Sequence, residues 1–568
     1  MKNRSVSIRL YRAVGVACAV AALLGLASCH KEPTAHAPAG GAQEAEPFFT
    51  GLGKIHIPLT TQSEDAQKYF DQGLALSFAF NHRPADRSFV EATVRDPNCA
   101  LCYWGSALVI GPNVNDYPMH PGNVARARVL AAQANRLAAN GSPKEQALAA
   151  ALVERYGPEG SNYDPTALNV AYADAMRAVA ALFPDDANVL ALAAESQMDL
   201  HPWDFWFVDG TSQPWTPEIV ATIEKALAVD PENIGAIHLY IHAVEQSQDA
   251  NRAAKYADRL ADLAPMAGHL VHMPAHIYIR VGRYHDSTLN NMKAIESDNS
   301  FLAACSSSSK DDYRLGYAPH NWHFGWITAA IEGWSAKAIE LAKGTAQVPS
   351  ESMRAPGLAA MRQHFYMQPS FAYLRFGRWD DVLAIPEPDQ DLIYARALWH
   401  YAAGEAELGK GHVEAARAHL DTLKMLSADP VLNDELLFTN NKAVDVLAVA
   451  QAFLSADVLR RSGDLNGAID GFETALDREI ALKYDEPPDW FYPVRHALGE
   501  AELAAGDAVN AERTYRADLE TYPENGWSLF GLAAALRAQG KNDEANAVDT
   551  RFKSAWAHAD VQLTATRL

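Results

Sequence analysis

Cysteine, long apolar runs and positive charge are all scarce in this chain of 568 residues. Its five cysteines include one Cys-x-x-Cys pair, which is too few for a four-cysteine zinc site. Beyond an apolar run near the start of the chain, no stretch is long and apolar enough to span a bilayer. The formal net charge of -22 has the opposite sign from that of a free-standing nucleic-acid binder, and it suits cationic ligands, metal ions or basic partner surfaces.

Several catalytic motifs are also missing. The chain has no glycine-rich phosphate-binding loop, no Gly-x-Ser-x-Gly and no His-Glu-x-x-His. The segment from His238 to Glu245 reads His-x-x-x-His-x-x-Glu, so its glutamate is not placed as in zincin proteases. From about residue 64 onward helical periodicity dominates, and no run of alternating β-branched residues is long enough for a sheet. The sequence therefore predicts an all-α fold.

The first residues have the pattern of an export signal. Four basic residues precede an apolar run from Ala13 to Leu26, which is too short for a membrane span but suits a signal peptide. The run ends in Leu26-Ala27-Ser28-Cys29, which resembles a bacterial lipobox. The resemblance implies cleavage before Cys29 and lipidation of that cysteine. The alternative is an ordinary signal peptide with an accidental cysteine.

A flexible tether and an envelope location follow from this interpretation. Residues 30–48 are rich in Ala, Pro, Gly and Glu, a composition typical of linkers. His30, rather than an aspartate, follows Cys29, which in enteric bacteria favours the outer membrane. We therefore expect a lipid-anchored protein of the bacterial cell envelope, at the outer membrane and facing the periplasm, with no membrane contact beyond its lipid anchor.

Helix-turn-helix units recur along the rest of the chain. In the first unit Gly73 is a small residue on one helix, Phe89 is an aromatic on the next, and Pro97 follows as a stop signal. This pattern resembles the tetratricopeptide repeat (TPR), and the resemblance implies a solenoid, a right-handed superhelix of helix-turn-helix pairs. The inter-helix turns are marked by Gly282, Gly333, Gly377, Gly463, Gly506 and Gly540. Second helices are expected to end near Pro97, Pro184, Pro231, Pro265 and Pro523.

We divide the chain by these features. The signal peptide is 1–28, the lipidated cysteine and tether are 29–55, and three groups of repeats follow at 56–300, 301–440 and 441–568. Three segments depart from the repeat pattern and are expected to be loops: residues 112–125, 202–215 and 300–313. Aromatic residues of the second loop, including Trp203 and Trp206, are candidates to cap a binding groove.

Histidines recur at the period of the repeat. His238 and His242 precede His272 and His276 by 34 residues, the length of one TPR unit. Counted back from the turn glycines, the histidines occupy equivalent positions on successive first helices, and His364 extends the series. Spacings of three and four residues place side chains on one helical face. In TPR proteins this face lines the concave groove, so the histidines are expected to converge there.

The residue types point to a metal site. Neutral imidazole is the commonest metal ligand in proteins, and a His pair at i and i+4 can chelate one ion. Zn, Cu and Fe are the candidate ions. A polar groove for a peptide and a purely structural use of the histidines explain the same pattern. The candidate ligands are His238, His242, Glu245, His269, His272, His276, His320 and His323.

The second candidate is the pair Cys99 and Cys102, at the junction between two predicted helices. A structural disulfide, metal ligation and redox chemistry at a helix N-terminus are all open. The pair lacks the following histidine that covalent haem attachment needs, and it lacks the βαβ context of thioredoxin.

Three functions compete at this stage. The first is a cell-envelope protein whose concave histidine cluster binds a ligand, either a transition metal or a metal-bearing molecule. The second is a scaffold that takes a protein or peptide partner in the groove during envelope assembly, although the Lys/Asn clamp of some TPR domains is not evident here. The third is a metal-dependent enzyme that uses the same cluster, with Glu245 as a ligand or base.

Overall fold

The structure is a computed structural model that describes residues 46–115, 119, 121–304, 313, 316–438 and 440–567. Ala45–Leu568 forms one compact unit. The described residues do not include the predicted signal peptide or the lipidation site Cys29. They also do not include Cys305, which lies in the third predicted loop, 300–313.

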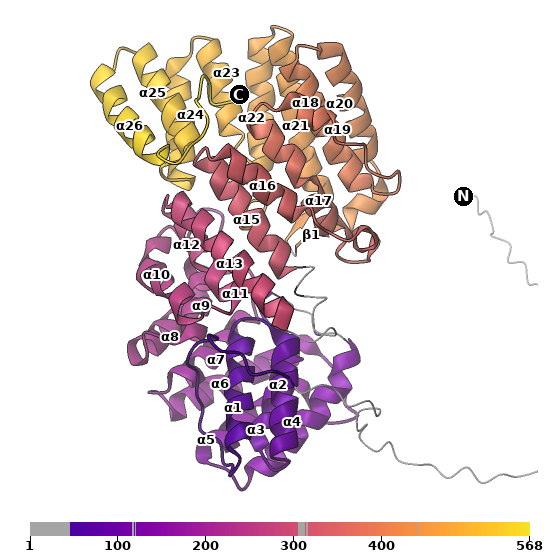
Figure 1. The fold of residues 1–568 in the computed structure, drawn as a ribbon, viewed down its shortest axis with the longest axis vertical. Helices are drawn as coiled ribbons and strands as arrows, with labels where there is room; N and C mark the ends of the chain where they lie inside the picture. Colours follow the sequence, from indigo (N-terminus) through magenta and orange to yellow (C-terminus); the bar gives the residue numbers. More distant parts are fainter. Residues whose placement is uncertain are drawn as a thin grey trace, which may run out of the picture. The chain divides into compact units, whose positions relative to one another are not determined.

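The described chain is an all-α array of TPR-like helix pairs (Figure 1). Consecutive helices pack against each other from one end of the array to the other. The first group of helices comprises α1 (Glu64–Phe78), α2 (His82–Arg95), α3 (Ala100–Val109), α4 (Val124–Ala138), α5 (Pro143–Tyr156), α6 (Pro165–Leu182), α7 (Ala187–Met198) and α8 (Thr216–Val229).

The middle of the array carries shorter helices. They are α9 (Ile234–Val244), α10 (Ala254–Leu263), α11 (Gly268–His272), α12 (Pro274–Arg280), α13 (Tyr284–Ala304), α15 (Tyr317–Ile331), α16 (Ser335–Thr345), α17 (Ala359–Arg375) and α18 (Trp379–Leu383). Because α13 runs to Ala304, the first residues of the predicted loop at 300–313 are helical.

The last group completes the array. Its helices are α19 (Ile393–Gly409), α20 (Val413–Ser427), α21 (Ala443–Arg461), α22 (Leu465–Ile480), α23 (Arg495–Ala504), α24 (Ala508–Thr521), α25 (Gly526–Ala538) and α26 (Asn542–Ala555). Short 3-10 helices are η1 (Pro121–Asn123), η2 (Ala250–Ala253), η4 (Ser350–Arg354) and η5 (Pro430–Asn433). The strands β1 (Leu436–Leu437) and β2 (Asn441–Lys442) form a small antiparallel pair.

Proline sets the ends of the second helices, as the sequence predicts. The helices α2, α6, α8, α10 and α24 each end two residues before a proline, at Arg95, Leu182, Val229, Leu263 and Thr521. A residue that precedes proline is driven out of helical geometry by a clash with the proline ring, so the helix cannot continue.

Glycine allows the tight turns and the close helix contacts. Gly282, between α12 and α13, has a φ of +78°, a conformation that residues with a Cβ rarely adopt. The other five predicted turn glycines also have positive φ. In the first unit, a Cβ on Gly73 of α1 would lie 2.8 Å from the ring of Phe89 on α2, so the two helices can meet only because Gly73 has no side chain.

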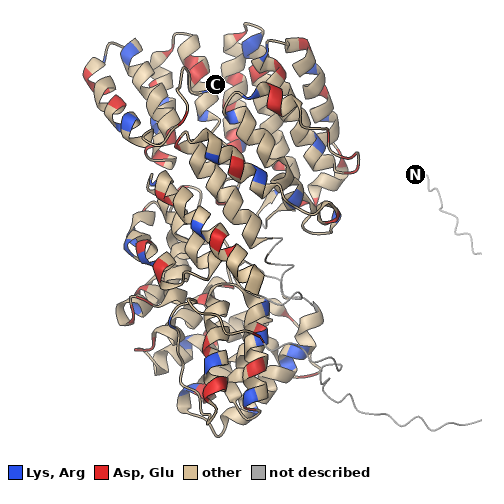
Figure 2. Cartoon of the chain, in the orientation of Figure 1, with Lys and Arg blue, Asp and Glu red and all other residues tan. Residues whose placement is uncertain are grey.

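The buried apolar residues form three cores in sequence order. The first extends from Leu52 to Phe301, the second from Ala275 to Trp527, and the third is confined to the last two repeats. Acidic and basic residues are interspersed over the helices (Figure 2). Within the described residues, no helix has the length and apolarity that a membrane crossing requires.

Candidate metal centre

Four helices of the middle group carry the predicted histidines. His238 and His242 lie on α9, and Glu245 is the C-cap of that helix. His269 and His272 lie on α11, while His276 lies on α12 after a break at Pro274, which cannot donate a backbone hydrogen bond. The helix α15 carries the remaining pair, His320 and His323. The 34-residue period therefore brings the corresponding faces of successive first helices together.

These side chains are buried rather than exposed on a groove wall. His238 and His272 are 0% exposed, and His242, Glu245, His269, His276 and His323 are also buried, whereas His320 is half-buried. The cluster lies where the first two cores meet, because Phe80 of the first core contacts His238 and Phe324 of the second contacts His276. Segments outside the four helices close over the histidines.

Three histidines form a first triplet. One nitrogen each of His238, His242 and His269 lies within 4.8 Å of the other two. The Nδ1 of His238 is 2.6 Å from the carbonyl oxygen of Phe78, and its Nε2 is 3.1 Å from the Nε2 of His269. The Nδ1 of His242 is 2.9 Å from Oε1 of Glu245. Among the described residues, no hydrogen-bond partner reaches the Nε2 of His242.

His272, His276 and His320 form a second triplet under the same criterion. The Nδ1 of His272 is 2.7 Å from Oδ1 of Asn291, and the Nδ1 of His276 is 2.5 Å from Oε2 of Glu245. The Nε2 atoms of His272 and His276 lie 2.8 Å apart. The rings of His272 and His320 are 4.8 Å apart between centroids.

The hydrogen bonds fix the protonation of four imidazoles. A carbonyl or carboxylate oxygen can only accept, so the Nδ1 atoms that face Phe78 and Glu245 carry the hydrogen. The amide nitrogen of Asn291 donates to the Ser287 carbonyl, which turns its oxygen toward His272. When these rings are neutral, the Nε2 atoms of His238, His242, His272 and His276 carry lone pairs. A ligand histidine in a metal site is held in this way, with its second nitrogen donating to an oxygen outside the site.

Glu245 is the only charged group that bonds to both triplets within the described residues. Burial raises the pKa of its carboxyl, but His276 and His242 outweigh that effect and lower the pKa to about 2. The carboxylate is therefore ionised, and each of its oxygens accepts from one triplet. The hydroxyl of Tyr484 lies 3.5 Å from the same carboxylate, from a segment 239 residues away in the sequence.

The imidazoles themselves are kept neutral. Burial lowers the pKa of His238, His242 and His269, and neighbouring histidines lower it further. The pKa values of His272 and His320 are lowered by the same causes. A neutral imidazole is the form that binds metal, so these five histidines are in their ligating form at neutral pH.

The nitrogen separations agree with metal ligation. Zn–N distances of about 2.0–2.1 Å in a tetrahedral site place ligand nitrogens roughly 3.3–3.4 Å apart. The observed Nε2 pairs, at 3.1 Å for His238 with His269 and 2.8 Å for His272 with His276, need to part by only a few tenths of an ångström. All six nitrogens come from histidine, a donor that suits Zn, Cu, Fe and Ni.

Three aromatic residues with strained backbones pack against the cluster. Phe80, Trp203 and Phe438 have φ values of +56°, +59° and +47°. Phe80 contacts all three rings of the first triplet, Trp203 lies edge-on to His242 with ring centroids 5.1 Å apart, and Phe438 lies 5.9 Å from His320. The sequence singles out Trp203 as a possible cap, but no pattern in it marks Phe80 or Phe438.

Two predicted positions lie apart from the triplets. His323 faces the other side of α15, where its ring is 5.7 Å from that of His364. His364 in turn lies 3.1 Å from the hydroxyl of Tyr394. Neither histidine joins a group of three potential ligands among the described residues.

A buried acidic segment, 484–489, was missed by the sequence interpretation. Burial raises the pKa of Glu486 and of Asp489 to about 7. Asp489 accepts a hydrogen bond of 2.7 Å from Asn441 of β2. The segment follows α22, and nothing in its local sequence links it to helices more than 200 residues earlier.

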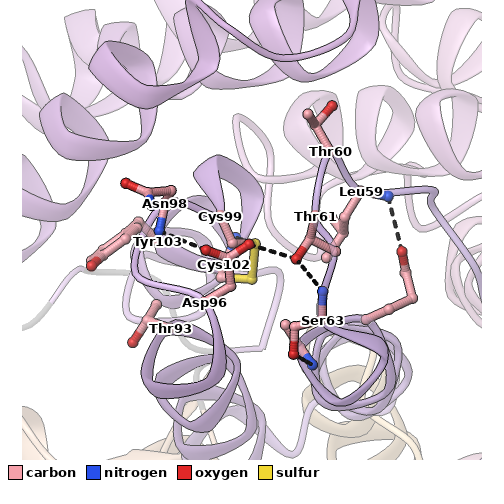
Figure 3. Close-up of a disulfide and its surroundings, with 12 residues drawn as sticks. Leu59, Thr60, Thr61, Ser63, Thr93, Asp96, Asn98, Cys99, Cys102 and Tyr103 are labelled. Carbon is pink, nitrogen blue, oxygen red and sulfur yellow. Dashed lines mark hydrogen bonds between the residues drawn. A yellow bond between two sulfur atoms is a disulfide. The ribbon is translucent and has the colours of Figure 1, made fainter.

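Cys99 and Cys102 form a disulfide at the start of α3 (Figure 3). The sulfur of Cys99 accepts from the backbone N–H of Cys102 and caps the helix. Both cysteines are at most 1% exposed. Beside them, the hydroxyl of Thr61 donates a hydrogen bond of 2.5 Å to Asp96, which joins the segment before α1 to the end of α2. The disulfide therefore lies in a packed junction between repeats.

Comparisons with known proteins supply no assignment. No family model matches the chain, and no curated protein matches it. Among solved structures, the Cut9–Hcn1 hetero-tetramer of the APC/C has 15% identity and a TM-score of 0.31, covering 84% of this chain and 78% of that one. The human IFIT1 dimer with m7Gppp-AAAA has 12% identity and a TM-score of 0.32, with 88% and 92% covered.

Yeast Tom70 is also similar, at 12% identity and a TM-score of 0.24, covering 87% of this chain and 91% of that one. These similarities are too low to carry an inference about ligands or partners. The assignment of the fold rests on the helix pairs described above, and any assignment of function rests on the histidine cluster.

Proposed function

We propose that this chain is a transition-metal-binding protein whose ligands are the two histidine triplets. The first would use His238, His242 and His269, and the second His272, His276 and His320. Zn and Cu are the preferred ions, because the donors are all imidazole and the affinity of such sites for divalent ions is greatest near the end of the first transition series.

The observation that carries the proposal is the contact between His272 and His276. Their Nε2 atoms lie 2.8 Å apart, and both rings are held with the hydrogen on Nδ1 by Asn291 and Glu245. Two lone pairs that face each other in a buried site repel unless a cation lies between them. The cation is either a proton or a metal ion, and His320 supplies the third nitrogen that a metal ion requires.

The envelope location remains part of the proposal. Lipidation at Cys29 would tether the helical array to a bacterial membrane, most simply the outer membrane facing the periplasm. Metabolic labelling with a radioactive fatty acid tests this step, and a Cys29→Ala variant that keeps the label would contradict it.

Metal analysis tests the function itself. Protein purified without a histidine tag is dialysed against Zn or Cu, and bound metal is measured by mass spectrometry together with the melting temperature. We expect stoichiometric metal and a raised melting temperature. A double variant, His242→Ala with His276→Ala, removes one ligand from each triplet and should lose both effects.

His496→Ala is the matched control, because His496 is a fully buried histidine of α23 that lies far along the chain and bonds to Asp518 and Arg375. It should weaken the fold without changing metal content. Wild-type protein that binds no metal, or a double variant that binds as much as wild type, rules out the proposed function.

A further inference from the structure

We propose that the two triplets form one two-metal centre, in which neighbouring ions share a small bridging ligand. The inference rests on the proposed function and deepens it, because it names the number of ions, their relation and the class of ligand between them. Two separate mononuclear sites are the alternative.

The triplets are in direct contact. The rings of His242 and His276, one from each triplet, have centroids 5.7 Å apart. His269 and His272 are neighbours on α11, with centroids 6.0 Å apart. Since Nε2 atoms face each other within each triplet and the two triplets are in contact, ions bound to the two triplets would be neighbours. Enzymes with two-metal sites hold their ions roughly 3.5–4 Å apart and use the pair to bind one ligand between them.

Glu245 links the two sets of ligands. Oε1 accepts from His242 and Oε2 accepts from His276, so the carboxylate fixes both rings relative to each other. A ring that moves to take an ion at one triplet therefore pulls on a ring of the other triplet. The carboxylate also places one negative charge beside two buried cations, which lowers the cost of binding them together.

The ligand class follows from what each triplet leaves open. Three protein nitrogens leave at least one position on a tetrahedral ion for an outside ligand. Aromatic rings lie directly on the imidazoles: Phe80 is 4.4 Å from His238, and Phe324 is 4.9 Å from His276 between centroids. Such close packing favours a small outside ligand over a large substrate.

The strained backbones of three aromatic residues are an independent sign that the histidine cluster is functional. Bulky residues with positive φ cost on the order of 1–3 kcal/mol each and persist where the surrounding structure forces them. Of the four such non-glycine residues in the described chain, Phe80, Trp203 and Phe438 all contact the cluster. They come from three loops that are far apart in sequence, so the convergence is not a local effect.

Copper titration with electron paramagnetic resonance tests the pair on the full chain. We expect wild-type protein to bind two Cu(II) per chain with an integrated signal far below two spins, because adjacent ions couple magnetically. Azide is the probe for the bridging ligand, and it should give a new absorption band only when both triplets are filled.

Two single variants provide the matched controls. His269→Ala disables the first triplet and His320→Ala the second, so each should bind one Cu(II), give the full signal of one spin and lack the azide band. The wild-type measurement needs no variant to fold. Two fully visible spins, or a single bound ion, would overturn the paired centre while leaving metal binding intact, whereas no bound copper means that the proposed function itself fails.

Discussion

Two buried polar clusters lie in different parts of the array, the histidine cluster of α9–α15 and an ion-pair network in the last group of helices. In the network, Arg567 contacts Glu405 of α19 at 2.5 Å and Asp457 of α21 at 3.2 Å. Arg460 contacts the same aspartate at 2.5 Å. Arg460 also lies 3.5 Å from Glu500, so the guanidinium groups and carboxylates of the network pair with each other within the chain.

The histidine cluster has no such balance. Its one carboxylate, Glu245, is already used to orient two imidazoles, and lone pairs on four Nε2 atoms face inward. The same kind of helix pair therefore buries polar groups for two purposes. The network compensates its own charges and stabilises the fold. The cluster has more nitrogen lone pairs than hydrogen atoms to pair with them, so it suits an added cation. The following predictions test whether this contrast holds.

The largest effect is expected in the network. Arg567→Met leaves Glu405 and Asp457 buried beside each other without their shared cation, and breaking a buried pair in this way costs about 3–5 kcal/mol. Urea denaturation measures the loss in the free energy of unfolding. The matched control is Arg551→Met, whose pair with Glu524 is nearly half exposed on both sides and should cost about 0–1 kcal/mol. Equal losses for the two variants would show that the network is not a charge-balanced structural element.

A smaller effect is expected when metal binds the cluster. At a free metal concentration of 100 times Kd, binding stabilises the folded state by about 2.7 kcal/mol, which slows hydrogen exchange roughly 100-fold. Because repeat units contact chiefly their neighbours, the protection should concentrate in α9, α11, α12 and α15 and leave α25 and α26 unchanged. Exchange measured by mass spectrometry with and without Zn checks the pattern, and uniform protection along the array would argue against a local site.

Removing the charge of Glu245 should weaken metal binding without removing a ligand. Glu245→Gln leaves an oxygen for only one of the two imidazoles, and losing such an outer contact typically costs 10–100-fold in metal affinity. Isothermal titration measures Kd. Glu332→Gln is the matched control, because Glu332 is also buried and holds the Nδ1 of a histidine, His285, outside the cluster. If both variants bind as tightly as wild type, Glu245 does not orient the ligands.

Much of the fold could be predicted because local rules decide it. Helices end two residues before their prolines, and Gly282 takes up the left-handed turn that its place in the repeat demands. The 34-residue period of the histidines predicts their convergence for the same reason, since equivalent positions on stacked helices must face the same way. His323 is the exception, because its side of α15 packs against His364 of α17 rather than against α11.

The closure of the site could not be predicted from the sequence. It depends on Phe80 from the turn between α1 and α2, on Trp203 from the loop after α7, and on Tyr484, which follows α22. These contacts span up to 239 residues, and no periodic pattern specifies them. A groove lined with histidines and a buried histidine cluster therefore have the same histidine spacing in sequence. Only the tertiary packing distinguishes them.

The smallest expected change is the response of metal affinity to pH. Burial lowers the pKa of His238, His242 and His269, so these imidazoles stay neutral below pH 6.5 and protons compete weakly with the ion. The same shift means that the unfolded chain takes up protons that the folded chain does not, so the metal-free fold loses stability as pH falls below about 6.5.

Affinity measured in His320→Ala, which retains only the first triplet, should change less than about twofold between pH 7.0 and 6.0, whereas three histidines of ordinary pKa would lose roughly 30-fold. Titrations at the two pH values decide between these outcomes. A 30-fold loss would mean that water reaches the imidazoles. In that case the cluster would be a groove lining that solvent reaches, and not a buried metal site.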